Sequence, residues 1–378
     1  MAQLVNPSLA DDAPLVVRAR AALAEHRWRD AYDLLTEADR TSELAPDELE
    51  LLAQASWWVG RLPDAIAARE RAYAGFVKAG NTLMAAATAG LVARDNLLRN
   101  AHSVARAWLS RGDRLAASLP EGRVHGWLEA TRGLDAGLSG EFASSLERAS
   151  RAYEIAQRAG DHDLEAIALS SKGFALIQLG RVDEGIALID EATVSAVAGE
   201  MEPLNAGAVS CTTISACASL GDWTRAGQWI EAQDRWCQRE HINGFPGMCR
   251  LHRAEAKLIH GAWTEAETEA RRAHDELEGF IPAAIGVALY EIAVIRLRRG
   301  DLPAAEEALL QAHARGRDPE PALSLLRLAQ GRTAEALASI RRAIEEPPTE
   351  AAWASAVPSS SLNRLSLLPA QIEIALAA

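Results

Sequence analysis

Residues 248–273, MCRLHRAEAKLIHGAWTEAETEARRA, carry the motif from which the fold of this chain can be predicted. Gly261 separates two stretches that are rich in the good helix formers Ala, Leu, Arg and Glu. Small residues lie seven positions before this glycine (Ala254), five after it (Ala266) and twelve after it (Ala273). Because glycine adopts the left-handed backbone conformation that ends many helices, the stretch predicts two helices joined by a tight turn at Gly261.

The same motif recurs along the chain at intervals close to 40 residues. Its anchor position is occupied in turn by Gly60, Asn100, Gly140, Gly180, Gly221, Gly261 and Gly300, at spacings of 40, 40, 40, 41, 40 and 39 residues. An earlier copy starts at His26, and a later one has its anchor at Gly331. A repeated pair of helices is typical of the tetratricopeptide repeat (TPR), whose usual period is about 34 residues. Each pair here is therefore longer by about six residues, less than one turn per helix.

Small residues recur where the two helices of each unit must cross. We number positions from the anchor, negative before it and positive after it. Position −7 holds Ala53, Ala93, Gly133, Gly173, Ala254 and Ala293, and position +5 holds Ala31, Ala65, Ala105, Ser145, Gly185, Ala226, Ala266, Ala305 and Ala336. Small side chains let two helix backbones approach closely. The chain is therefore predicted to be all-α, a right-handed superhelix (solenoid) of stacked TPR-like helix-turn-helix repeats.

Composition divides the chain into four predicted segments. Residues 1–13 are expected to form a flexible tail, and residues 14–346 the TPR-like repeat array. Residues 347–361 are rich in Pro and Ser and predict a loop. Residues 362–378 predict the first helix of a further, truncated repeat. A single terminal helix is an unusual end for a solenoid, so we expect more repeats or another domain to follow in the parent protein.

Charge and composition argue against several function classes. The formal net charge is −13 and the Arg residues are interleaved with Asp and Glu, which predicts no direct binding of nucleic acid. No apolar run reaches the length of a membrane span, and the N-terminus lacks the pattern of a signal peptide, so a cytoplasmic location is expected. The four cysteines form no CxxC motif and are predicted to be reduced core residues: Cys211, Cys217, Cys237 and Cys249.

No constellation of residues predicts catalysis. The sequence contains neither a phosphate-binding loop nor a nucleophile elbow. The run Asp161-His162-Asp163 falls at a turn between repeats, where such residues cap helices. His252 and His260 are eight positions apart, without the spacing of a helical zinc pair. We therefore expect no enzymatic activity, no cofactor and no metal.

Several stretches resemble the helical region of large actinobacterial transcriptional regulators of the LuxR type, relatives of the maltose-regulon activator. They are residues 102–115 (HSVARAWLSRGDRL), 188–204 (LIDEATVSAVAGEMEPL), 211–226 (CTTISACASLGDWTRA), 245–267 (FPGMCRLHRAEAKLIHGAWTEAE) and 321–343 (PALSLLRLAQGRTAEALASIRRA). The resemblance covers most of residues 14–378. It implies a sensing or partner-docking module. The chain departs from that family because it has neither a nucleotide-binding loop nor a basic recognition helix.

In the TPR register, positions −13, −10, −6 and −3 face the concave inner wall of the superhelix. These positions are mostly apolar here, as in a site for a small molecule or an apolar peptide. The candidate residues among them are Trp127, Phe174, Met248, Glu255 and Tyr290. Two alternatives remain open at this point: Trp127 could belong to the core, and the longer helices could rotate the whole register so that these side chains are simply buried.

A polar stripe lies beside this wall at positions −9 and −8. Arg132, Lys172 and Arg253 occupy position −8 in three repeats, where an ordinary TPR has a buried Leu, and unpaired charges are costly to bury. Either they pair with Asp135, Glu165 and Glu255, or they face the lumen and hold an anionic group of a ligand. Thr213 and His252 complete the candidate ligand-binding set.

Two functions are compatible with these features. The first is a sensor that binds a small, largely apolar effector in the lumen, with or without an anionic group. The second is a scaffold that docks a peptide, a protein or a neighbouring domain on the same concave face. A homo-oligomer is compatible with either function, and no membrane partner is expected.

Overall fold

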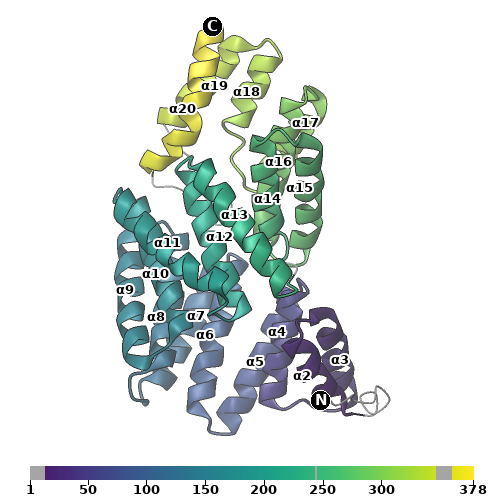
Figure 1. The fold of residues 1–378 in the computed structure, drawn as a ribbon, viewed down its shortest axis with the longest axis vertical. Coiled ribbons are helices and arrows are strands. Elements are labelled where there is room, and N and C mark those ends of the chain that lie inside the picture. Colours follow the sequence, from purple (N-terminus) through teal and green to yellow (C-terminus); the bar gives the residue numbers. More distant parts are fainter. Residues whose placement is uncertain (1–12, 243–244, 346–359) are drawn as a thin grey trace, which may run out of the picture.

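The computed structural model describes residues 13–242, 245–345 and 360–378, and all regular elements in these ranges are helices (Figure 1). Within these ranges, nine helix pairs are followed by a single helix. The pairs are α2 (Leu15–Ala24) and α3 (Trp28–Thr41), α4 (Pro46–Trp58) and α5 (Leu62–Lys78), α6 (Thr82–Leu98) and α7 (His102–Ala116), α8 (Arg123–Leu138) and α9 (Phe142–Ala159), α10 (His162–Gln178) and α11 (Val182–Ala198), α12 (Pro203–Ser219) and α13 (Trp223–Arg239), α14 (Met248–Ile259) and α15 (Trp263–Glu278), α16 (Ile285–Arg298) and α17 (Leu302–Ala314), α18 (Ala322–Ala329) and α19 (Thr333–Glu345). The last helix is α20 (Ser360–Ala377), and a short 3₁₀ helix, η1 (Pro282–Ala284), precedes α16.

The anchor residues end the first helix of each pair in the left-handed conformation, as predicted. Gly60 has φ 78° and Gly261 also has φ 78°. Asn100 and His26, which replace the glycine in two units, reach φ 59° and φ 57°. The turn geometry that the sequence motif predicted is thereby confirmed, and with it the all-α solenoid.

Close helix crossings explain the small residues. A Cβ atom added to Gly173 on α10 would lie 2.6 Å from the carbonyl oxygen of Gly185 on α11. The reverse addition, on Gly185, would place a Cβ atom 2.5 Å from the carbonyl oxygen of Gly173. Ala53 and Ala65 occupy the equivalent positions of α4 and α5 and are fully buried. A larger side chain at these positions would push the two helices apart.

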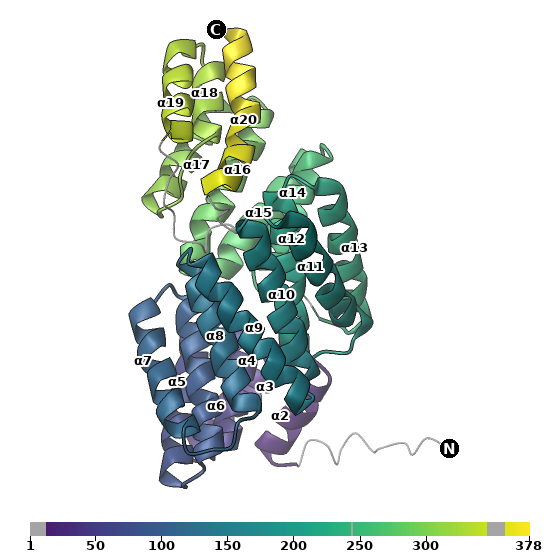
Figure 2. The same cartoon turned by 90° about the vertical axis from the view of Figure 1, so that its left-hand side faces the viewer.

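The helices form two layers. First helices pack on the first helices of neighbouring repeats, as α8 does on α6 and α10, and α10 on α12. Second helices pack mainly on the first helices around them. The first helices therefore form the inner wall of the curved array and the second helices its outer layer (Figure 2).

A cluster of aromatic rings joins the N-terminal repeats to the middle of the array. Trp57 at the end of α4 packs edge-on against Phe245 and Phe280, with 4.9 Å between ring centroids in both pairs. Trp58 packs against Phe245 at 5.6 Å. Nearby, His26 Nδ1 lies 2.7 Å from the backbone oxygen of Glu240. The superhelix thus closes on itself, and α4 lies beside the segment from α13 to α15 (Figure 1).

Most of the predicted flexible tail and nearly all of the predicted Pro/Ser-rich loop fall outside the described residues. Helix α20 packs on α19 and α18. No helix in the described part of the chain combines the length and the apolar character needed to cross a membrane.

Candidate binding site on the inner wall

The basic residues of the polar stripe are held at the joints between repeats. Arg132 on α8 pairs with Asp113 on α7, the second helix of the preceding repeat, and its Nη1 lies 2.8 Å from Oε1 of Glu129. Lys172 on α10 places its Nζ 4.7 Å from the ring centroid of Tyr153 on α9. In both joints, position −8 of one repeat contacts position +13 of the preceding repeat.

Two further joints follow the same rule. The Oγ1 atoms of Thr213 on α12 and Thr193 on α11 are 2.6 Å apart, and both threonines are buried. Arg253 on α14 donates from Nη1 to Oδ1 of Asp234 on α13 at 3.1 Å. Four successive joints therefore carry a polar contact between positions −8 and +13. Position −8 of the polar stripe is explained by packing between repeats.

The partners of the arginines differ from those expected from the sequence. Asp135 accepts instead from Arg106 at 2.6 Å and lies 2.7 Å from Nδ1 of His102. Arg132 pairs with Asp113 on the preceding second helix and with Glu129 one turn earlier on α8, whereas Asp135, one turn later on α8, is held by Arg106 and His102. The expected pairing of Arg132 with Asp135 was wrong, although structural ion pairs do hold Arg132 and Arg253.

Trp127 on α8 and Phe174 on α10 lie on the inner wall four and three repeats before Tyr290, the third aromatic candidate. The indole N–H of Trp127 donates to Oδ2 of Asp161 at 3.0 Å. Asp161 is the N-cap of α10 and accepts from the backbone N–H of Leu164 at 3.1 Å, which confirms its predicted role as a cap. Phe174 packs edge-on against Phe142 at 6.4 Å. Both candidate rings are half-buried and engaged with neighbours.

Five of the predicted residues gather on the neighbouring first helices α14 and α16. Met248, His252, Arg253 and Glu255 come from α14, and Tyr290 from α16. His252 is only 6% exposed, yet neither ring nitrogen makes a hydrogen bond to the described residues. Its closest acidic neighbour is Glu255, with Oε2 3.6 Å from Nδ1. A buried polar group without a hydrogen bond is costly, and such groups in native proteins call for an explanation.

Two more charged residues belong to this place, and the candidate set omitted both. Glu291 on α16 is half-buried; burial raises the pKa of its carboxyl to about 8, with a contribution from the nearby charge of Glu255. Arg317 opposes this shift and lies over the ring of Tyr290, 4.7 Å from its centroid. Burial raises the pKa of the Tyr290 phenol as well. We call His252, Glu255, Tyr290, Glu291 and Arg317 the inner-wall cluster.

The two omissions have different reasons. Glu291 stands at position −9, the same as His252 in the preceding repeat, and the polar stripe already indicated it. Arg317 follows the second helix α17 by several residues and returns to the inner wall through a connecting segment. No periodic pattern marks it, because its position depends on the path of that segment.

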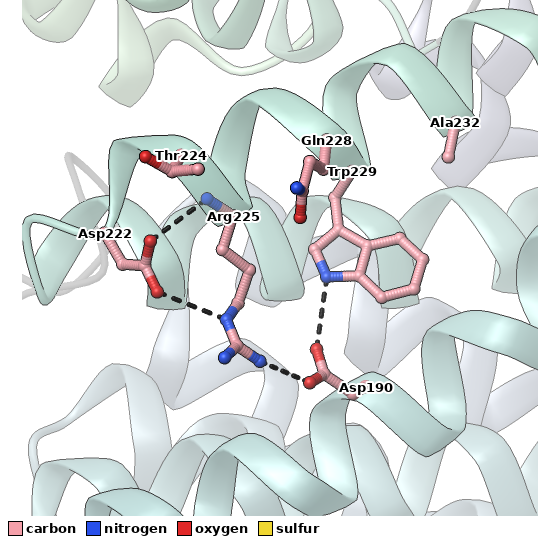
Figure 3. Close-up of a pocket in the computed structure, with 7 residues that line it drawn as sticks. All are labelled: Asp190, Asp222, Thr224, Arg225, Gln228, Trp229 and Ala232. Carbon is pink, nitrogen blue, oxygen red and sulfur yellow. Dashed lines mark hydrogen bonds and ion pairs between the residues drawn. The ribbon is translucent and has the colours of Figure 1, made fainter.

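The outer layer carries a cleft of about 490 Å³ between α11 and α13 (Figure 3). Asp190 accepts from the indole N–H of Trp229 at 3.1 Å and pairs with Arg225. Asp222, the N-cap of α13, accepts from the backbone N–H of Arg225 at 3.0 Å. The charged groups that line this cleft are therefore matched to one another.

A second outer cleft, also of about 490 Å³, lies between α15 and α17. Glu267 lines it and is paired with three arginines: with Arg271 at 2.7 Å, Arg296 at 3.3 Å and Arg299 at 2.7 Å. These ion pairs lower the pKa of the Glu267 carboxyl against the opposing effect of burial. The protein's own carboxylate thus occupies the place that an anionic ligand would take.

Comparison with known proteins gives similarity at the level of helical repeats only. No family model matches the chain, and no curated protein matches it. Among solved structures, a monomeric mutant of IFIT1 with Gppp-AAAA has a TM-score of 0.45 at 14% identity and covers 95% of this chain and 77% of that one. The apo form of RapI has a TM-score of 0.42 at 10% identity and covers 97% and 99%. Yeast Tom70 has a TM-score of 0.30 at 13% identity and covers 95% of each.

Proposed function

We propose that this chain is the non-enzymatic effector-binding module of a bacterial transcriptional regulator, and that its effector binds at the inner-wall cluster. The link to a regulator comes from the sequence resemblance to LuxR-type proteins. The observation that carries the binding site is His252, a buried imidazole whose Nδ1 lies 3.6 Å from Glu255, the carboxylate whose charge also acts on Glu291. Its two nitrogens make no hydrogen bond to any residue that the structure describes. A ligand that forms a hydrogen bond there would satisfy a group that is otherwise costly to bury.

The charges at this site favour an effector with a cationic group, which departs from the anionic effector that the sequence suggested. Arg132 and Arg253 are paired with carboxylates, and Lys172 lies on the ring of Tyr153. Glu291, by contrast, keeps its proton near neutral pH because burial, together with the charge of Glu255, makes its ionisation unfavourable. When Glu291 is ionised, the cluster holds two carboxylates against the single guanidinium of Arg317, so an ammonium group would complete the balance of charge. Half-buried Met248 would contact the apolar part of the ligand.

The alternative is a docking scaffold for a peptide or a neighbouring domain on the same face. Apolar side chains at positions −13 and −6 remain half-buried in more than one repeat, as Ile167, Phe174 and Val294 illustrate. An extended wall of this kind fits a peptide segment that spans several repeats better than it fits one small molecule. The two proposals share a surface and differ in how many repeats contribute to binding.

Thermal unfolding in the presence of a panel of small ammonium compounds and matched carboxylic acids tests the proposal. We expect ammonium compounds to raise the midpoint, and we expect the double variant Glu255→Gln/Glu291→Gln to lose that shift. Glu278→Gln, on the exposed end of α15, is the matched control and should keep it. Stabilisation by the acids alone, or an ammonium shift that the double variant retains, would refute the site.

Titration at several pH values adds a second criterion. A bound cation lowers the pKa of Glu291 and releases its proton, so affinity should rise with pH until about pH 8. The single variant Glu291→Gln should abolish this dependence. For the docking alternative, a peptide should lose affinity on substitution of Phe174, which lies two repeats away from Glu255.

A further inference from the structure

The two outer clefts occupy equivalent places in the array but differ in charge. Each lies between the second helices of successive repeats, α11 and α13 in one case and α15 and α17 in the other. Both clefts are lined by position +10 of one repeat and position +4 of the next. In the first cleft these positions hold Asp190 and Arg225, which form an ion pair. An ion pair therefore spans that cleft from one helix to the other.

The cleft between α15 and α17 has a different pair of residues at these positions. Position +10 holds Arg271 instead of an aspartate, and position +4 holds Ala304 instead of an arginine. The methyl group of Ala304 cannot bind a guanidinium, and Arg271 turns back to Glu267 on its own helix. The ion pair that spans the first cleft therefore has no counterpart at these two positions of the second.

Three guanidinium groups line this second cleft against two carboxylates. Arg296 and Arg299 come from the end of α16 and join Arg271 around the carboxylate of Glu267. The other carboxylate, Asp301, is the N-cap of α17 and accepts from a backbone N–H of that helix at 3.3 Å. The first cleft has one guanidinium against two carboxylates. A cleft with a surplus of positive charge stands out in a chain of net charge −13, and we call it the outer basic cleft.

The arginines of the outer basic cleft keep N–H groups for a further partner. Arg271 donates from Nη2 to Oε1 of Glu267 at 2.7 Å, and Arg299 donates from Nη1 to Oε2 at 2.7 Å. Each thus spends on Glu267 one of the several donors that a guanidinium carries. The side chains of Arg271 and Arg299 are 56% and 45% exposed, whereas that of Glu267 is 11% exposed. Glu267 therefore holds the guanidinium groups from the buried side, and about 490 Å³ of the cleft remains free of protein atoms.

We propose that the outer basic cleft binds a phosphoryl group through Arg271 and Arg299. Such a group carries a charge of about −1.5 to −2 near neutral pH and presents three acceptor oxygens. Its charge offsets the surplus of the cleft, and the planar fork of arginine matches the geometry of its oxygens. A carboxylate offers a single charge and two oxygens, so it should bind more weakly. The site lies in the outer layer and does not depend on the proposed effector site on the inner wall.

Equilibrium dialysis of the full folded chain against radiolabelled inorganic phosphate, at constant ionic strength, tests the proposal. We expect saturable binding of one phosphate per chain. Arg271→Gln and Arg299→Gln should each weaken binding by about tenfold, the effect of one lost hydrogen bond between charged groups. Arg272→Gln is the matched control and should bind like wild type, because this exposed arginine is the next residue of α15 and does not line the cleft.

A second pair of variants restores a carboxylate across the cleft. Ala304→Glu places a negative charge opposite Arg271, at the position from which Arg225 spans the first cleft. We expect it to weaken phosphate binding by about tenfold or more, because the protein's own carboxylate then competes for the guanidinium. Ala304→Gln has the same size without the charge and should retain binding. Circular dichroism melting of each variant checks that the chain is folded.

Competition against the labelled phosphate identifies the source of the phosphoryl group. Displacement by methyl phosphate as efficient as by inorganic phosphate would indicate a phosphorylated ligand, and displacement by inorganic phosphate alone would indicate the free ion. Acetate should compete about tenfold less well than either. Absence of saturable binding up to about 10 mM phosphate would overturn the proposal. So would equal competition by acetate, or an equal loss of binding in Arg272→Gln and Arg271→Gln.

Discussion

Two kinds of contact stabilise this molecule in different ways. The joints are the contacts between position −8 of one repeat and position +13 of the repeat before it. The aromatic closure is the cluster of Trp57, Trp58, Phe245 and Phe280, which joins α4 to the middle of the array. Each joint links residues about 20 positions apart, and its central contact is polar in four consecutive cases, from Arg132–Asp113 to Arg253–Asp234. The closure links Trp57 on α4 to Phe245, 188 positions away, and to Phe280, 223 positions away. Trp57 and Phe280 are buried and Phe245 is half-buried. Ion pairs that keep contact with water contribute at most about 1 kcal/mol each, whereas a buried aromatic ring contributes several.

The contrast shows where the stability of a tight superhelix comes from. The joints fix the orientation of each repeat relative to the next. Weakening a single joint should cost little stability, because the neighbouring joints remain intact. The closure restrains the curvature of the whole array, and it depends on few side chains. Substitutions should therefore have small effects at the joints and large effects at the closure.

The largest effect is expected for Phe280→Ala. Phe280 is 2% exposed and packs against Trp57, so truncation should cost about 3–5 kcal/mol and release the N-terminal repeats from α13–α15. Urea unfolding and small-angle scattering measure the two consequences. Trp263→Ala, at a ring that is 39% exposed, is the control and should cost less than about 1 kcal/mol. An equal loss of unfolding free energy in the two variants would show that the closure contributes no more to stability than an exposed ring does.

Gly173→Ala should be the next largest effect and tests the crossing within one repeat. The added Cβ would lie 2.6 Å from the carbonyl oxygen of Gly185 and equally close to a side-chain carbon of Ile189. Overpacking of this kind costs about 1–3 kcal/mol, to be measured by chemical denaturation. Gly227→Ala on α13 is the matched control. Nothing lies within 4 Å of its added Cβ, so helix propensity alone should make it stabilising by up to about 1 kcal/mol.

A pH-dependent effect is expected at the inner-wall cluster. The folded chain binds a proton on Glu291 up to about pH 8, while the unfolded chain releases it at the ordinary pKa of a glutamate. The folded state therefore holds more protons between these values, and the free energy of unfolding falls as pH rises from about 5 to about 8. We expect a loss of about 2 kcal/mol, a discounted figure for a half-buried group. The difference in stability between wild type and Glu291→Gln should show this slope, and a flat difference would contradict it.

The smallest effect is expected at a joint. A double-mutant cycle of Arg253→Met and Asp234→Asn should give a coupling energy below about 1 kcal/mol, because both side chains keep contact with water. Urea denaturation at low and high salt measures it, and salt should reduce it further. A coupling above about 2 kcal/mol would place the joints on a par with the closure and remove the contrast between them.

The candidate site was only partly accessible from the sequence. The TPR register correctly placed His252, Glu255 and Tyr290 on neighbouring first helices, because positions −9, −6 and −10 repeat with the anchor. The same register could not tell that position −8 turns towards the preceding second helix, so Arg132, Lys172 and Thr213 entered the candidate set although neighbouring repeats hold them. A side chain's direction depends on helix rotation, which spacing alone does not fix.

The tryptophans show a similar dependence on tertiary structure. Trp28, Trp223 and Trp263 share position +2, where sister repeats carry other apolar residues and packing is expected. Trp28 stacks on Trp58 at 4.8 Å, whereas Trp223 and Trp263 are 36% and 39% exposed. Trp28 differs because it lies next to the aromatic closure, which shields it. The same residue at the same position has a different environment according to what the curvature brings near it.

The helices, their turns and the crossing of each pair follow from the amino-acid sequence alone. These features are local: a glycine with positive φ and small residues at fixed distances act within a few tens of residues, and the period repeats them along the chain. The tertiary structure was needed to show that α4 meets Phe245 and Phe280, and that Arg317 returns to Tyr290. Such contacts depend on the rotation that accumulates from repeat to repeat, where small differences in each joint add up to the final curvature.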